Sequence, residues 1–196
     1  MGIEFPDYGH KFRTILADPP WHTTDAGASA RPRSWKMIAN STPNRDEEEQ
    51  LYPTMKYREL EAMPVESLAA PQAHLWMWSM NGTVEQAYRL IRAWGFNPMF
   101  PMTWCKTGEK GNPVFGMGVY VRMNTEQLIF ATRGTPAIMP AVPWMGSFFF
   151  APRSTHSRKP DKQYEIIEQV SDGPRIELFA RRPREGWTSW GNELRV

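Results

Sequence analysis

The chain has 196 residues, of which 41% are hydrophobic and 13% aromatic, values that are typical of one globular domain and exclude a disordered chain. It lacks the apolar run of about 18 residues that a membrane-spanning helix needs, and residues 1–10 show no signal-peptide pattern. A net charge of +2 does not by itself indicate a polyanionic partner, one cysteine excludes an internal disulfide, and the four histidines show no metal-ligand spacing. We therefore expect a cytoplasmic protein with no metal site and no membrane contact.

The first expected strand, residues 12–17, ends at the turn Asp18-Pro19-Pro20-Trp21. Two prolines fix their φ angles and lack N–H groups, so the turn is stiff and its carbonyls are expected to be free acceptors. One oxygen of Asp18 and one proline carbonyl can accept both N–H groups of an exocyclic amine, while Trp21 can stack on the ring. The turn therefore indicates a site for an amino-purine or amino-pyrimidine, with the nitrogen lone pair directed toward an electrophile.

A long polar stretch follows, from residue 22 to about residue 52, with almost no apolar periodicity. It exceeds the usual length of a loop, which indicates a functional flap or a disordered insertion. Both ends of the stretch flank the expected base pocket. We expect it to close over the base and to contact nucleic-acid phosphates through Arg31, Arg33 and Lys36.

The rest of the chain alternates expected helices and strands. Residues 57–70 predict short helical pieces broken at Pro64, and residues 73–78 predict a strand. Thr83 and Gln86 fit a capping box ahead of a helix that ends at Gly95. Further strands are expected at residues 99–105, 127–131 and 175–180, and a helix that starts at Pro160 is expected before the last of them.

This alternation predicts an α/β fold with a mainly parallel sheet flanked by helices, in a single domain over residues 1–196. Ligands of such sheets bind beyond the carboxyl ends of the strands, so Asp18 and Arg181 are expected to meet in one crevice. A glycine-rich dinucleotide fingerprint is missing from the sequence, so side chains must hold any nucleotide-like cofactor.

Several motifs, in order, resemble those of the MT-A70-like family of adenine methyltransferases. They run from the segment that ends in Asp18-Pro19-Pro20-Trp21 through Tyr52-Pro53-Thr54-Met55, Leu75-Trp76-Met77-Trp78, Ala93-Trp94-Gly95-Phe96, Trp104-Cys105-Lys106, Asn124-Thr125-Glu126, His156-Ser157-Arg158-Lys159-Pro160-Asp161 and Glu177-Leu178-Phe179-Ala180-Arg181 to Gly191-Asn192-Glu193. The amine-binding motif precedes the cofactor-side motifs, which is similar to the permuted, Rossmann-like arrangement of the amino-methyltransferases. The resemblance implies transfer of a methyl group from S-adenosylmethionine to the N6 amine of adenine in nucleic acid, with DNA favoured over RNA.

The resemblance also implies roles for individual residues. Asp18 and the Pro19 carbonyl would accept the amine protons, with Pro20 completing the catalytic turn, and Trp21 and Tyr52 would sandwich the base. Asp18 would also contact the cofactor, and Lys159 would bind the cofactor carboxylate. Arg181 with the Asn192–Glu193 pair would bind the ribose and adenine of the cofactor. Lys106 and Glu126 would contact the target nucleoside.

Three alternative functions stay open at the level of the sequence. A cytosine N4-methyltransferase needs the same amine geometry, an RNA adenosine N6-methyltransferase differs only in its substrate, and a non-catalytic scaffold subunit would bind nucleic acid for an active partner. The intact acid and aromatic residue of the Asp18 turn argue against the scaffold. The sequence also leaves open whether the chain forms a homodimer or joins a partner subunit.

Overall fold

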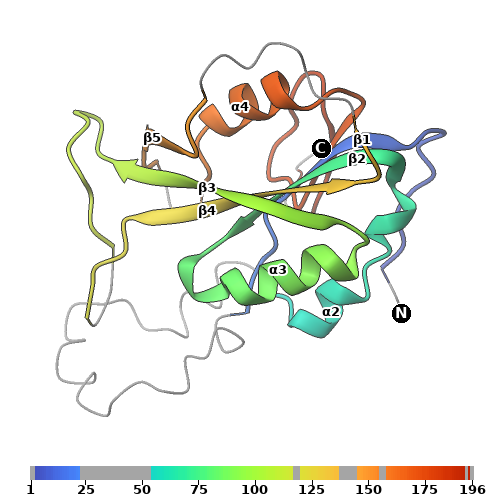
Figure 1. The fold of residues 1–196 in the computed structure, drawn as a ribbon, viewed down its shortest axis with the longest axis horizontal. Coiled ribbons are helices and arrows are strands. Elements are labelled where there is room, and N and C mark those ends of the chain that lie inside the picture. The colour runs from blue at the N-terminus through green and yellow to red at the C-terminus, as the bar shows by residue number, and fades with distance from the viewer. Residues whose placement is uncertain are drawn as a thin grey trace.

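A computed structural model describes residues 3–22, 54–116, 120–136, 145–154, 158–192 and 194. Its strands are β1 (Phe12–Ala17), β2 (Ala69–Ser79), β3 (Asn97–Thr107), β4 (Thr125–Arg133), β5 (Phe148–Pro152), β6 (Arg175–Leu178) and β7 (Thr188–Trp190). They form one seven-stranded sheet in the order β5-β3-β4-β2-β1-β6-β7 (Figure 1). Strand β4 pairs antiparallel with β2 and β3, and the other described pairings are parallel. The expected α/β fold with a mainly parallel sheet is confirmed.

Helices cover both faces of the sheet. They are α2 (Tyr57–Glu61), α3 (Val84–Ala93) and α4 (Lys162–Val170), with short 3₁₀ turns at Val65–Ser67 and Asn81–Thr83. Helix α4 lies on one face, and α2 and α3 lie on the other (Figure 1). None of the described helices is long and apolar enough to cross a membrane.

Strand β2 is buried on both of its faces, which explains its nearly continuous apolar sequence. Leu75 and Met77 belong to the core cluster on the side of α2 and α3, whereas Trp76 and Trp78 belong to the cluster on the side of α4. Trp76, Trp78 and Trp94 are each only 1% exposed. These tryptophans are therefore core residues.

Helix α3 ends as its sequence predicts, because Gly95 adopts a φ of +82° after the last turn. The N–H of Gly95 donates to the carbonyl of Arg92, and the N–H of Phe96 donates to the carbonyl of Ile91. These two bonds form a Schellman motif. It satisfies helix-end carbonyls and buries Ile91 against the same core as Phe96.

The expected capping box at the start of this helix is wrong. Thr83 makes no side-chain capping bond, and its hydroxyl instead donates to the Met80 carbonyl at 3.2 Å and lies 3.1 Å from the Ser79 hydroxyl. The physical reason is the 3₁₀ turn Asn81–Thr83, which precedes the helix and turns the Thr83 side chain back toward β2. The sequence analysis also missed the two short edge strands, β5 and β7.

At the carboxyl edge of the sheet, the turn that follows β6 packs against the turn that follows β7, with backbone contacting backbone. Strand β6 ends two residues earlier than expected because Phe179 adopts a φ of 62°, which cannot continue a strand. The next residue, Ala180, donates its N–H to the Trp190 carbonyl at the end of β7. A Cβ atom on Gly191 would lie 2.7 Å from the Ala180 nitrogen and closer still to its carbonyl oxygen, so this contact requires glycine.

We expect Gly191→Ala to lower the free energy of unfolding by about 1–3 kcal/mol, the usual cost of overpacking, because both contacting groups are backbone. Gly146→Ala is the matched control, since its added Cβ would come no closer than 3.8 Å to the Phe148 ring. Urea unfolding of both variants measures the difference. Equal stability of the two variants would show that the turns can separate without cost.

Candidate active site

The predicted site residues come together at the carboxyl edge of the sheet. Asp18 directly follows β1 and Arg181 closely follows β6, and these two strands are parallel neighbours. Burial raises the pKa of the Asp18 carboxyl group, and the positive charge of Arg181 is close enough to act in the opposite direction. Lys159 lies just before α4, and the exposed Asn192 follows β7 at the same edge.

Four charged side chains form a continuous row of ion pairs, which we call the ion-pair chain. Lys106 Nζ lies 2.5 Å from Glu126 Oε1, Glu126 Oε2 lies 3.2 Å from Lys159 Nζ, and Lys159 Nζ lies 3.0 Å from Asp18 Oδ1. None of these side chains is more than 22% exposed. The ion-pair chain therefore carries two positive and two negative charges in a largely dry environment.

Burial and charge act in opposite directions on the pKa values of the ion-pair chain. Burial raises the pKa of Asp18, and the nearby Glu126 raises it further, while Lys159 opposes both; the result lies above the ordinary value. For Glu126, burial raises the pKa, but Lys159 and Lys106 together bring it below the ordinary value. For Lys159, burial lowers the pKa, but Asp18 and Glu126 outweigh burial and raise it. Asp18 is thus the acid that depends most on Lys159 for its ionisation.

Two buried indoles form the floor under the ion-pair chain. The Lys106 ammonium lies 5.0 Å from the ring centroid of Trp104, and the Lys159 ammonium lies 5.4 Å from that of Trp78. Trp78 donates its N–H to Gln163 Oε1 at 2.6 Å, and Trp104 donates to the Ala151 carbonyl at 2.9 Å. Cation–π contact and the exclusion of water by these rings both strengthen the ion pairs above them.

The proline carbonyls of the Asp18 turn already accept backbone hydrogen bonds, which differs from the expectation of free acceptors. The Pro19 carbonyl accepts from the Trp21 N–H and the Pro20 carbonyl from the Met55 N–H, each at 2.8 Å. The first bond closes the turn on itself, and the second arises because Trp21 and Met55 form a parallel β-bridge. Each carbonyl oxygen has a second lone pair, so the Pro19 oxygen can still accept one more donor.

Trp21 is mostly buried in the core, with 8% of its surface exposed. Its indole N–H donates to the Trp78 carbonyl at 3.1 Å, which fixes the ring against β2. Little of the Trp21 surface is therefore exposed for the stacking on a base that the sequence predicts. Tyr52, the expected second aromatic, lies outside the described residues, as do Arg31, Arg33, Lys36 and Glu193.

Glu126 has an acceptor atom that suits a ligand. Its Oε2 is buried, and its one contact within the described part of the chain is the ion pair with the Lys159 ammonium at 3.2 Å. A buried carboxylate oxygen with an unused lone pair can accept an N–H from an amine or an ammonium group. The site therefore fits a ligand that carries a carboxylate for Lys159 and N–H donors for Asp18 and Glu126, as S-adenosylmethionine and an adenine amine together do.

Glu177 on β6 is a buried acid to which the sequence analysis gave no role. Its Oε2 accepts the Tyr164 hydroxyl at 2.9 Å. Burial raises its pKa to about 7, helped by the negative charge of Asp18 and opposed by the Tyr164 hydrogen bond and by Arg182 and Arg184. The available signal was an acid inside the apolar run at residues 175–180.

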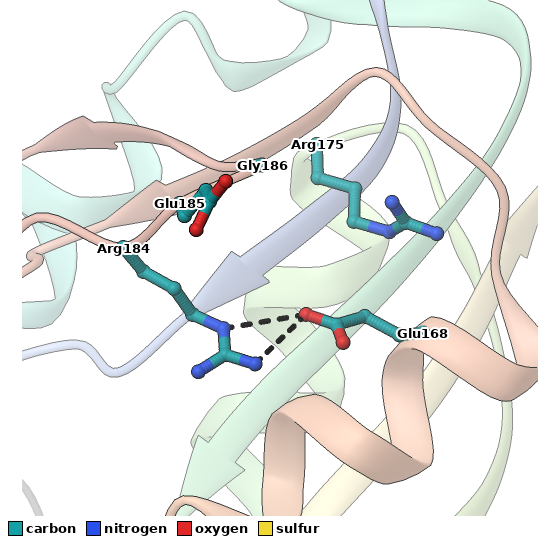
Figure 2. Close-up of a pocket in the computed structure, with 5 residues that line it drawn as sticks. All are labelled: Glu168, Arg175, Arg184, Glu185 and Gly186. Atoms are coloured by element: carbon teal, nitrogen blue, oxygen red, sulfur yellow. Dashed lines mark hydrogen bonds and ion pairs between the residues drawn. The ribbon is translucent and has the colours of Figure 1, made fainter.

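A hollow of about 420 Å³ lies away from this site and is lined by Glu168, Arg175, Arg184, Glu185 and Gly186 (Figure 2). The Arg184 guanidinium holds Glu168 Oε1 there at 3.1 and 3.3 Å. Arg175 begins β6, so this hollow is near the amino end of a strand whose carboxyl end approaches Asp18. None of the predicted site residues lines it.

The raised pKa of Glu177 predicts a pH dependence of stability. The folded value of about 7 lies above the ordinary 4.5, so the stabilising contribution of the protonated form is complete below 4.5 and is lost as pH rises to about 7. From this group we expect the free energy of unfolding to fall by about 3 kcal/mol over that range. Glu177→Gln, which still accepts the Tyr164 hydroxyl, should remove this part of the slope in urea unfolding. An unchanged slope in the variant would contradict the assignment.

Comparison with known proteins gives consistent matches over almost the whole chain. The sequence model of the MT-A70 family matches residues 12–193. The type II methyltransferase M.MunI of Mycoplasma sp is 28% identical over 193 residues, which cover 94% of this chain and 78% of that protein. The N6-methyladenosine RNA methyltransferase MTA1 of Cryphonectria parasitica is 28% identical over 190 residues, covering 93% of this chain and 52% of that protein. The N(6)-adenine-specific methyltransferase METTL4 of Homo sapiens is 24% identical over 201 residues, covering 96% and 38%.

This chain therefore spans most of the first relative and about half or less of the other two. The matched residues 12–193 include the strand that precedes the Asp18 turn and all four members of the ion-pair chain. The match confirms the enzyme class that the motifs predict, an S-adenosylmethionine-dependent adenine N6-methyltransferase. By its sequence, this chain belongs to the MT-A70 family.

Proposed function

We propose that this protein methylates the N6 amine of adenine in nucleic acid, with DNA as the substrate ahead of RNA, and that the reaction takes place at the Asp18 turn. The observation that supports this most directly is the Asp18 carboxylate, largely buried at a strand end and ion-paired with Lys159 at 3.0 Å. A buried, ionised acid beside a stiff turn is suited to accept N–H donors from a planar amine.

The chemistry assigned to Asp18 follows from the electronic structure of the amine. The lone pair of an aromatic amine is delocalised into the ring, so the nitrogen is a weak nucleophile. Acceptance of one N–H by Asp18 and of the other by the Pro19 carbonyl draws the nitrogen toward tetrahedral geometry and frees its lone pair. S-adenosylmethionine supplies a methyl group on a sulfonium centre, and the electron pair of the broken S–C bond stays on sulfur as the N–C bond forms.

The nitrogen is positively charged after transfer and must lose a proton. Asp18 is suited to receive it, because burial has already raised the pKa of this carboxyl group. In the ligand-free protein Lys159 stabilises the ionised form of Asp18, and after transfer water can accept the proton. Most of the rate enhancement then comes from positioning and from electrostatic stabilisation in a dry site.

The cofactor is assigned to the side of α4 and β6. Lys159 would bind its carboxylate, and Arg181, Asn192 and Glu193 would bind its ribose and adenine. On the substrate side, Trp21 and Tyr52 would hold the base, and the segment from residue 22 to residue 52 would contact phosphates through Arg31, Arg33 and Lys36. A flipped base costs a few kcal/mol of unstacking, which contacts to these aromatics help to offset.

DNA is placed ahead of RNA because the chain spans 78% of the type II methyltransferase, against 52% of the relative named as an RNA methyltransferase. RNA is the second candidate, and the name of that relative is the observation that favours it. One assay separates these cases. The protein is incubated with methyl-labelled S-adenosylmethionine and with DNA or RNA in parallel, and the product is digested to nucleosides.

Labelled N6-methyldeoxyadenosine from DNA is the expected product. N6-methyladenosine from RNA alone would favour RNA, the second candidate. N4-methylcytosine would show that the target base is cytosine and not adenine. Cofactor binding without any labelled product would support a scaffold subunit. A homodimer or a complex with a partner subunit is compatible with each of these results, so the protein should be assayed at several concentrations.

We expect Asp18→Asn to lower the rate of methyl transfer by on the order of 10²-fold or more, because a transition-state hydrogen bond to a charged acceptor is lost. Asp172→Asn is the control, since Asp172 is an exposed acid that pairs with Arg13 at 2.8 Å. Single-turnover rates and urea unfolding should be measured for both. Retention of more than about a tenth of the rate by a folded Asp18→Asn protein would contradict the mechanism.

A further inference from the structure

One feature of the ion-pair chain is a competition for Lys159. The ammonium of Lys159 lies 3.0 Å from Asp18, the acid assigned to the substrate amine, and 3.2 Å from Glu126. The same ammonium is assigned to the carboxylate of the cofactor. In the ligand-free protein, therefore, Asp18 occupies the ammonium group to which the cofactor carboxylate is expected to bind.

The two acids around Lys159 are not held equally. Glu126 is also bound by Lys106 at 2.5 Å, on the side away from Lys159. Asp18 is ion-paired with Lys159 at 3.0 Å, and the positive charge of Arg181 adds a weaker attraction. If a third carboxylate approaches the same ammonium, repulsion among the acids is relieved at the lowest cost by release of Asp18.

We propose that cofactor binding releases Asp18 from Lys159 by carboxylate exchange, so that the cofactor prepares the catalytic acid for the substrate amine. This inference rests on the proposed function and adds to it an order of binding, in which the cofactor comes before the substrate amine. Without the cofactor, Lys159 occupies the Asp18 oxygen that an amine N–H would use. With the cofactor carboxylate on Lys159, that oxygen becomes available, while Glu126 and Lys106 keep the ammonium in place.

The exchange is a coupling between two binding sites, so it is measurable without turnover. S-adenosylhomocysteine carries the amino-acid arm but no transferable methyl group, and 5′-methylthioadenosine lacks that arm altogether. The substrate oligonucleotide identified by the methyl-transfer assay is compared with the same oligonucleotide carrying purine, which lacks the exocyclic amine, at the target position. Fluorescence anisotropy gives the oligonucleotide Kd with each nucleoside at saturation.

S-adenosylhomocysteine should tighten binding of the adenine oligonucleotide by at least about fivefold, the lower end of typical coupling between sites. The tightening should be absent with 5′-methylthioadenosine and absent with the purine oligonucleotide. Equal effects of both nucleosides, or equal effects on both oligonucleotides, would overturn the exchange. Failure of S-adenosylhomocysteine to bind at all would instead contradict the proposed function.

Variants test the competition from the side of the protein. Asp18→Asn removes the carboxylate that pairs with Lys159, so S-adenosylhomocysteine should no longer tighten binding of the adenine oligonucleotide to this variant. Tightening of the wild-type size in this variant would overturn the exchange. Lys159→Met should abolish the coupling, whereas Lys162→Met, which removes an exposed lysine paired with Glu165, should retain it. If Lys159→Met does not fold, the Asp18→Asn result decides alone.

Discussion

The site depends on the pairing of four charges in a place with little water. Each buried charge is costly unless an opposite charge compensates it, and here every member of the ion-pair chain has a partner within 3.2 Å. Loss of one member leaves its neighbour buried and unpaired, so the four residues behave as a unit. The state of Asp18 is therefore set by residues from three other parts of the chain.

The sheet topology brings these parts together. Lys106 and Glu126 come from the antiparallel pair β3 and β4, while Asp18 follows β1 on the other side of β2. Lys159, from the segment before α4, bridges the two groups. Trp78 of β2 fills the space beneath it and excludes water from the bridge. The buried tryptophans thus have an electrostatic role in addition to their role in the core.

The sequence predicted the features that depend on local pattern. Apolar runs located the central strands, Gly95 located the end of α3, and the order of the strands brought Asp18 and Arg181 to one edge of the sheet, while the roles of the site residues stay predictions. The edge strands β5 and β7 were missed because three to five residues carry too little periodic signal. The contact between Lys159 and Asp18 was missed for another reason, since it joins residues 141 positions apart and follows only from the three-dimensional arrangement. The use of the Pro20 carbonyl was missed because it depends on Met55, which lies beyond the long polar stretch.

The bridge between Trp21 and Met55 has a consequence for how this family can vary. It fixes the chain on both sides of residues 23–53 at one point, through the hydrogen bond from Met55 to the Pro20 carbonyl. The entropy of closing a loop grows only with the logarithm of its length, so doubling such a segment costs about 0.6 kcal/mol. The segment between these two anchors can therefore change in length at little cost while Asp18 keeps its place.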